Sequence, residues 1–165
     1  MNQEERMDYL IHELCQESEQ YKNIVVPKGE RRRVLRSLMN IRMPKPIGAD
    51  FLKIQDDFLT EEIRIRGIVK WNDIKTVREQ YGSQMEYADR ISIWQGDITG
   101  LSADAIVNAA NSQMLGCFYP CHGCIDNAIH SAAGIGLRQE CAKIMKLQGY
   151  EEPVGGAKIT RGYNL

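Results

Sequence analysis

Three cysteines and one histidine lie within eight residues of the chain, a density that is typical of metal binding or reactive-thiol chemistry. Cys117, His122 and Cys124 offer two thiolates and an imidazole, a set that suits tetrahedral Zn²⁺ and leaves a fourth position for substrate or water. Ligation by Cys121 would fill that position and make the site structural. A set of unligated cysteines is the remaining alternative, but these residues lie among glycine and proline turns rather than on an apolar helical stripe.

Polar residues that could bind a ligand follow two predicted strands. Residues 91–95 alternate apolar and polar side chains shortly before Asp97, and the apolar run 105–107 precedes Asn108. Ligands of α/β sheets bind at the carboxyl ends of strands, where Asp97 and the segment Asn108–Asn111 both fall. An aspartate at a turn also caps the backbone, which is the alternative for Asp97.

A helical stripe of apolar residues follows the cysteines and runs from Ile125 to the glycine at position 149. Asp126 lies in its first turn, where the carboxylate either caps the helix or faces the cysteines. His130 lies four residues later on the same face, and we expect it to be packed or hydrogen-bonded. Cys141 belongs to the apolar stripe and is expected in the core.

The remaining elements predict a helical first half and an α/β second half. Apolar residues at helical spacing predict helices over residues 5–23 and 30–42, and the mixed pattern over residues 51–71 predicts a loop with short helix or strand pieces. A further strand is expected at residues 157–160, so the second half reads as an α/β layer protein. The basic run Arg31–Arg33 is expected to be a solvated helix start, with a phosphate or acidic-partner grip as the alternative.

The composition excludes several classes of function. The 165 residues carry 21 basic and 22 acidic side chains, so the overall charge does not favour a nucleic-acid or membrane-surface protein. No apolar run approaches the roughly 20 residues that cross a bilayer, and the N-terminus lacks the apolar segment of a secretory signal. The odd cysteine count argues against a disulfide framework. We therefore expect a cytoplasmic protein.

Four motifs stand in the order and spacing of one known module. They are Gly-Asp-Ile-Thr at 96–99, Ala-Asp-Ala-Ile-Val-Asn-Ala-Ala-Asn at 103–111, Asp-x-x-Ile-His at 126–130 with Ala-Gly at 133–134, and Gly-x-Ala-x-Ile-Thr-x-Gly-Tyr at 155–163. Together they resemble the opening of a macrodomain, the ADP-ribose-binding α/β/α module. The cysteine-bearing segment 116–127 departs from ordinary macrodomains and resembles the zinc-dependent subclass of bacteria and fungi, whose members are protein-ADP-ribose hydrolases.

The resemblance implies a three-layer α/β/α macrodomain over residues 87–165, of which the N-terminal half of the sheet is present. Residues 1–86 would then be the mainly helical N-terminal extension of the subclass. A whole macrodomain is longer than the matching segment, so we expect a C-terminally truncated chain. It would lack a second glycine-rich loop, whose backbone N–H groups cradle the diphosphate.

The same resemblance implies roles for individual residues. Asp97 and the backbone of Ile98 would bind the adenine, and Asn111 would bind the distal ribose. Asp126 would position or deprotonate the attacking water, with Asn127 adding an amide contact beside it. The zinc ligands of the subclass fall on Cys117, His122 and Cys124.

Two further positions take secondary roles in this interpretation. The subclass has no ligand at the position of Cys121, which we therefore expect to be a bystander. Asn108 is expected to brace its loop rather than to act in catalysis.

The resemblance therefore implies a zinc-dependent hydrolase that removes mono-ADP-ribose from modified protein side chains. Esters of Asp or Glu are the favoured linkage, because an ester needs less help to leave than an N-glycoside. The partners would be a mono-ADP-ribosylated protein and ADP-ribose, with a sirtuin-type ADP-ribosyltransferase and a lipoyl-carrier protein system as wider associates. The alternatives are a non-catalytic ADP-ribose-binding module, for which Asp97 and Asn111 suffice, and a structural zinc-binding interaction domain in which Cys121 also ligates.

Overall fold

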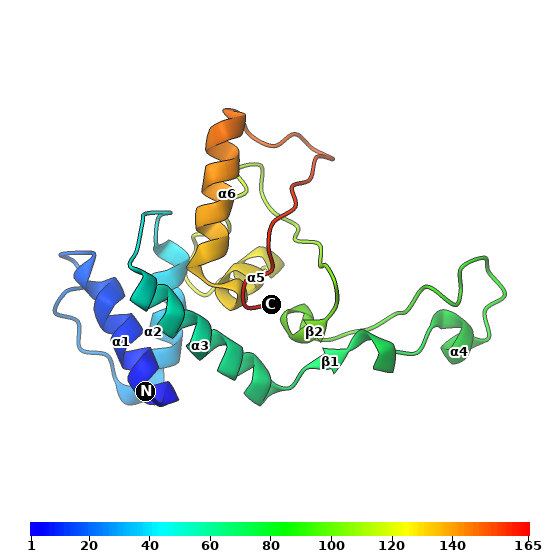
Figure 1. Cartoon of the computed structure of the whole chain (residues 1–165), viewed down its shortest axis with the longest axis horizontal. Coiled ribbons are helices and arrows are strands. Elements are labelled where there is room, and N and C mark those ends of the chain that lie inside the picture. Colours follow the sequence, from blue (N-terminus) through cyan, green and yellow to red (C-terminus); the bar gives the residue numbers. More distant parts are fainter.

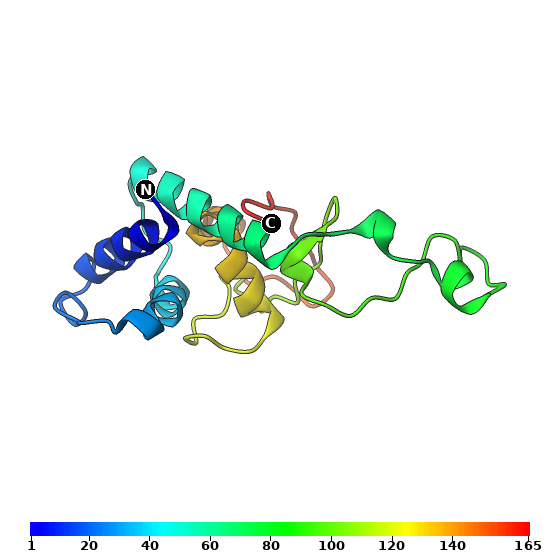
Figure 2. The same cartoon turned by 90° about the horizontal axis from the view of Figure 1, so that it is seen from below.

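The computed structural model describes residues 1–165, which form a helical body and an extended arm (Figure 1). The arm comprises residues 67–96 and projects from the end of the third helix, as Figure 2 also shows. The helices are α1 (Gln3–Gln16), α2 (Arg31–Ile41), α3 (Ala49–Arg66), α4 (Val77–Tyr81), α5 (Ile125–Ala133) and α6 (Ile135–Gln148). Short 3₁₀ turns lie at Lys28–Glu30, Trp71–Asp73 and Ile98–Gly100.

The first three helices pack around one hydrophobic core. Helices α1 and α2 confirm the two predicted helices with shorter bounds, and Asn2 and Glu5 form a capping box at the start of α1. Apolar residues three and four apart line the inner faces and are almost fully buried. They include Leu10, Ile11, Leu14, Leu35, Leu38, Met39, Phe51, Phe58 and Leu59.

The loop predicted over residues 51–71 is wrong, because α3 occupies most of this segment. Phe51, Phe58, Leu59 and Ile63 recur at helical spacing and are all buried. The apolar residues that follow belong to the exposed arm, so they blurred the period in the sequence. The helix ends at Gly67, whose φ of 95° carries the chain out into the arm.

The single helix predicted after Ile125 is divided into α5 and α6 at Gly134. Gly134 has φ 90°, and a Cβ there would lie 2.5 Å from the side-chain nitrogen of Gln55. Gln55 in turn accepts a hydrogen bond from the backbone N–H of Ile135 at 3.0 Å. A close approach between α3 and the α5–α6 corner therefore requires glycine at this position.

The sheet is small. Strands β1 (Val69–Lys70) and β2 (Leu101–Ser102) pair in parallel, with Val69 opposite Leu101. The chain thus combines helices with a parallel sheet, as the α/β prediction requires, while the three-layer arrangement and the boundary between residues 86 and 87 stay predictions.

The strands predicted at 91–95, 105–107 and 157–160 are not formed in this structure. The only pairing at these positions is one antiparallel bridge between Ser92 and Thr76. A strand is stable only when a neighbouring strand satisfies its backbone groups, and no further strand pairing forms at these residues. The predicted burial of 105–107 is likewise wrong, because Val107 is 87% exposed.

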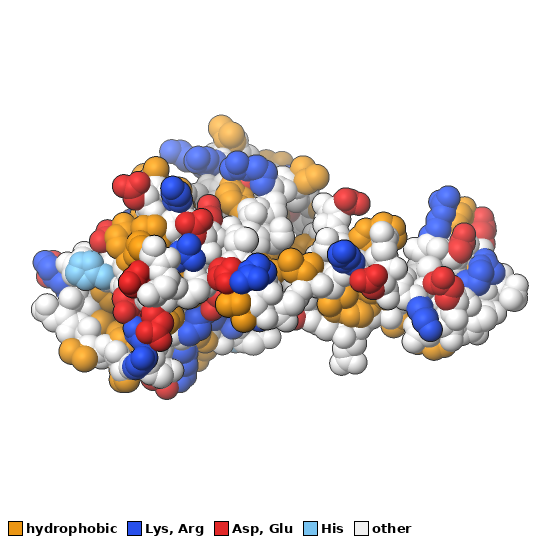
Figure 3. Space-filling model, turned by 60° about the horizontal axis from the view of Figure 1, so that its bottom comes forward, with side chains coloured by type: hydrophobic (Ala, Val, Ile, Leu, Met, Phe, Trp, Pro, Cys, Tyr) orange, Lys and Arg blue, Asp and Glu red, His pale blue; other side chains and the backbone are white.

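Charged residues of both signs are interspersed over the face shown in Figure 3, on the body and on the arm. The basic run is less solvated than predicted, because its first two residues form ion pairs between helices. Arg31 binds Asp8 of α1 at 2.6 Å, and Arg32 binds Glu62 of α3 at 2.6 Å. No helix is both long enough and apolar enough to cross a membrane.

Candidate metal centre and ligand site

The side chains of Cys117, His122 and Cys124 converge in the loop that precedes α5, which we call the metal loop (residues 115–124). Their donor atoms all lie within 4.8 Å of one another, and the Cys117 sulfur lies 3.7 Å from His122 Nδ1. Metal bonds of about 2.0–2.3 Å place the donors of one tetrahedral zinc ion roughly 3.5–4 Å apart. Two sulfurs and one imidazole in this arrangement therefore fit a zinc ion with little movement.

Local backbone geometry gives the metal loop its shape. Gly116 has φ 80°, and a Cβ there would lie 2.7 Å from the ring of His130, so the loop passes directly over this histidine. At the other end, Cys124 is the N-cap of α5, and its sulfur accepts the backbone N–H of Asn127 at 3.4 Å. Cys124 therefore joins the metal loop to the first turn of α5.

Cys121 points away from the other cysteines and toward α2. Its sulfur lies 3.2 Å from the Ser37 hydroxyl and 3.5 Å from the Arg33 carbonyl oxygen. The structure therefore separates Cys121 from the group formed by Cys117, His122 and Cys124.

Asp126 is buried in the first turn of α5, beside the metal loop. Its Oδ1 accepts a hydrogen bond from Asn108 Nδ2 at 2.7 Å. The alternative of a helix-capping aspartate does not hold, because Cys124 occupies the N-cap position and Asp126 accepts no backbone N–H. Asn108 thus links the loop after residue 107 to α5.

His130 lies under Asp126, with Nε2 3.6 Å from Asp126 Oδ1 and Nδ1 without a hydrogen-bond partner. Burial lowers the pKa of His130 to about 4, although the Asp126 charge opposes that shift. The imidazole is consequently neutral near pH 7 and packs beneath Gly116, as a buried structural histidine would.

Asp97 accepts hydrogen bonds from both the backbone N–H and the hydroxyl of Thr99, at 3.0 and 2.7 Å, and so caps the turn that follows it. Its Oδ2 binds Arg66 at 2.8 Å in an exposed ion pair. Burial raises the pKa of the Asp97 carboxyl, but the Thr99 hydrogen bonds and Arg66 outweigh it and lower the pKa overall. The capping alternative thus describes Asp97 here, and its adenine contact stays a prediction.

The other predicted ligand residues have different surroundings. Ile98 is half-buried and packs against the cluster around α5 and α6. Asn111 is exposed, and its Oδ1 accepts the backbone N–H of Gln113 at 3.1 Å. Asn127 is fully buried, and its amide is held within the protein by Arg36 and by the carbonyl oxygen of Tyr119, so contact with a ligand requires it to exchange one of these bonds.

The structure therefore gathers some predicted residues and leaves others apart. Asp126 and Asn127 join the three candidate metal ligands at the start of α5. Asp97 and Asn111 make no hydrogen bond to this group. The two ends of the predicted ligand site are thus held by different contacts.

Sequence reasoning missed Arg138, which is 4% exposed and holds the metal loop against α2. Its guanidinium donates to the carbonyl oxygens of Leu115 and Cys117 in the loop. It also donates to the carbonyl oxygens at the end of α2, those of Met39, Asn40 and Arg42. Its charge on the otherwise apolar face of the predicted helix was the one signal in the sequence.

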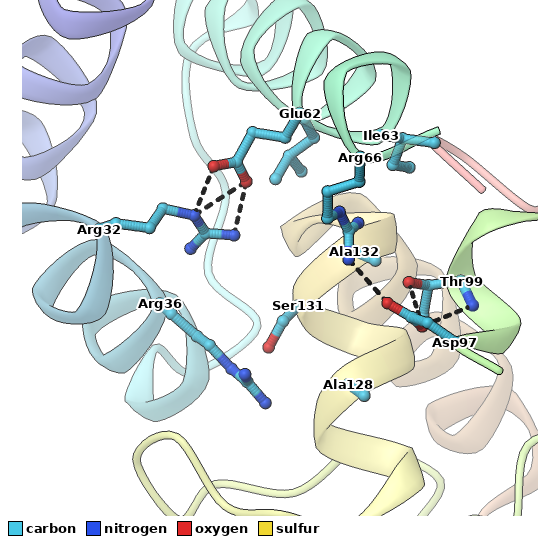
Figure 4. Close-up of a pocket in the computed structure, with 11 residues that line it drawn as sticks. Arg32, Arg36, Glu62, Ile63, Arg66, Asp97, Thr99, Ala128, Ser131 and Ala132 are labelled. Atoms are coloured by element: carbon cyan, nitrogen blue, oxygen red, sulfur yellow. Dashed lines mark hydrogen bonds and ion pairs between the residues drawn. The ribbon is translucent and has the colours of Figure 1, made fainter. Parts of the chain in front are cut away.

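A cavity of about 110 Å³ lies between α2, α3 and α5 beside Asp97 (Figure 4). The Arg32–Glu62 and Arg66–Asp97 ion pairs form parts of its wall, and Arg36 extends from α2 toward α5. The cavity is polar and is lined in part by Asp97, the residue that is predicted to bind adenine.

These features define an α/β chain with a candidate metal centre at the start of a helix, beside a polar cavity. Residues 107–165 match the model of the Macro domain family, which is the similarity that the motifs predicted. The match covers the metal loop, α5 and α6.

The whole chain is also similar to curated relatives. It is 49% identical over 167 residues to a protein-ADP-ribose hydrolase of Treponema medium, covering 100% of this chain and 62% of the relative. It is 41% identical over 162 residues to a protein-ADP-ribose hydrolase of Staphylococcus aureus (strain COL), covering 97% of this chain and 57% of the relative. The chain thus spans roughly three-fifths of the length of these relatives.

Proposed function

We propose that this chain carries the metal centre of a zinc-dependent hydrolase that removes mono-ADP-ribose from modified protein side chains. The observation that carries the proposal is the convergence of Cys117, His122 and Cys124 beside the buried carboxylate of Asp126. The hydrolase names of two relatives at 41% and 49% identity support the reaction class.

The metal assignment rests on donor chemistry. Cys117, His122 and Cys124 would hold the ion, and the position of Cys121 against α2 supports a site with a fourth position open to substrate. When bound, zinc supplies a Lewis acid that stabilises negative charge developing on oxygen.

Asp126 would orient the attacking water and accept its proton. Asn108 occupies Oδ1 and fixes the carboxylate, and Oδ2 makes no hydrogen bond in this structure, so Oδ2 is the atom available for the water.

ADP-ribose would extend from the metal loop toward Asp97. Asn111 would bind the distal ribose, Asn127 would add an amide contact, and Asp97 with the Ile98 backbone would bind the adenine. The substrate class is a protein carrying mono-ADP-ribose on an Asp or Glu ester. A sirtuin-type ADP-ribosyltransferase and a lipoyl-carrier protein system remain the proposed wider partners.

The direct test is release of ADP-ribose from a protein modified on glutamate. We expect Asp126→Asn to lower kcat by roughly 10²–10⁴-fold, the usual contribution of a general base. Asp104→Asn, at an exposed aspartate of the neighbouring loop, is the matched control and should turn over at the wild-type rate. Full turnover after zinc is removed by a chelator would refute the metal role, and ADP-ribose binding without release would favour a non-catalytic binding module.

A further inference from the structure

Two side chains of helix α2, one helical turn apart, form hydrogen bonds to the backbone of the metal loop. Asn40 Oδ1 accepts the backbone N–H of Cys121 at 2.9 Å. Arg36 Nη2 donates to the backbone carbonyl of His122 at 3.2 Å. Both bonds reach the part of the loop between Cys117 and Cys124, and each joins residues more than 80 positions apart in the sequence.

Arg36 also holds the residue that fixes the other end of the loop. Its Nε and Nη2 donate to Asn127 Oδ1 at 3.1 and 2.6 Å. Asn127 donates in turn from its amide to the carbonyl oxygen of Tyr119 at 2.9 Å, and from its backbone to the Cys124 sulfur at 3.4 Å. One guanidinium therefore restrains the backbone of His122 directly, and it also holds the side chain of the fully buried Asn127, whose backbone N–H contacts the sulfur of Cys124.

The bonding of Arg36 differs from that of its neighbours in α2. Arg31 and Arg32 bind carboxylates of α1 and α3, whereas Arg36 has no carboxylate partner and uses its planar fork on an amide and a carbonyl oxygen. Lysine cannot reproduce that two-point geometry. Figure 4 shows Arg36 extending from α2 toward α5, separate from the ion pairs of the cavity wall.

We propose that Arg36 is a positioning residue for the metal centre, which sets His122 and Cys124 at the spacing that one ion requires. The inference rests on the proposed function, because it takes these residues as zinc ligands. Residues that orient metal ligands without touching the metal commonly change affinity by about 10- to 100-fold when they are removed.

The experiment measures zinc affinity of the full chain by competition with a chromogenic chelator. We expect Arg36→Ala to weaken zinc binding about 10- to 100-fold. Arg33→Ala is the matched control, because Arg33 lies on the same helix, is 76% exposed and pairs only with Glu30, and it should bind zinc as the wild type does. Wild-type affinity in Arg36→Ala would overturn the proposal.

Two further measurements separate positioning from loss of fold. The visible spectrum of the Co²⁺-substituted protein reports ligand geometry, and we expect weaker tetrahedral bands in Arg36→Ala while its helical circular dichroism is unchanged. If Arg36→Ala does not fold, Arg36→Lys provides the test, because lysine keeps the positive charge and most of the aliphatic part of the side chain. We expect Arg36→Lys to bind zinc more weakly than wild type, and equal affinity would overturn the proposal. A wild-type chain that binds no zinc would instead refute the proposed metal centre itself.

Discussion

The metal loop and the segment around Asp97 lie at opposite ends of the predicted ligand site and are held in different ways. Buried or half-buried side chains from α2, α5 and α6 bind the metal loop across long stretches of sequence. Asp97 is held by Thr99, two residues away, and by one exposed ion pair to Arg66. The metal loop is therefore held by several buried or half-buried tertiary contacts, whereas Asp97 is held by a residue two positions away and by one exposed ion pair.

The largest expected effect at the metal end comes from Arg138→Met. The change leaves five backbone carbonyl oxygens of α2 and the metal loop without their donor and removes the guanidinium that stacks 4.2 Å from the Phe118 ring. We expect unfolding free energy to fall by roughly 3–5 kcal/mol, measured by urea denaturation. Arg90→Met in the exposed arm is the control and should change it by less than about 0.5 kcal/mol. Equal losses of unfolding free energy in the two variants would contradict the claim that tertiary contacts hold the metal loop.

A pH dependence of stability is the next largest effect. Burial lowers the pKa of His130 to about 4, below its ordinary value of 6.5, so the unfolded chain binds this proton more readily than the folded chain does. Above pH 6.5 the histidine is neutral in both states and does not reduce stability. As the pH falls from 6.5 toward 4, the free energy of unfolding falls by roughly 3 kcal/mol in total. Denaturation between pH 4 and 7, with a chelator present, measures this slope. His130→Asn should flatten it, and His12→Asn, at an exposed site in α1, should not.

The smallest effect is expected at the Asp97 end. Arg66→Ala removes an ion pair whose side chains are 50% and 57% exposed, and such pairs contribute less than about 1 kcal/mol. It should also raise the pKa of Asp97, because the Arg66 charge helps to lower it. Urea denaturation and NMR titration of the carboxyl would measure both changes. A loss of stability as large as that of Arg138→Met would show that the segment around Asp97 is held as strongly as the metal loop.

The same contrast explains what the sequence could predict. The Cys117, His122 and Cys124 spacing and the helix starting at Ile125 are local patterns, and the structure brings these side chains together as the pattern suggested. Arg36 and Arg138 were not found, because their partners are backbone carbonyls and an amide far along the chain.

The strand predictions failed for a related reason. The run 105–107 has the composition of a buried strand, but burial and strand pairing depend on a neighbour that the local sequence does not specify. The loop predicted over 51–71 failed because apolar residues of the exposed arm were read together with the buried face of α3.

Metal content of the purified chain tests the central claim most directly. Elemental analysis should give one zinc per chain for the wild type and for Cys121→Ser, whose thiol contacts α2 rather than the other ligands. Cys117→Ser, His122→Ala and Cys124→Ser should each lose the metal. Zinc retained by all three of these variants, or lost from Cys121→Ser, would contradict a metal centre built from Cys117, His122 and Cys124.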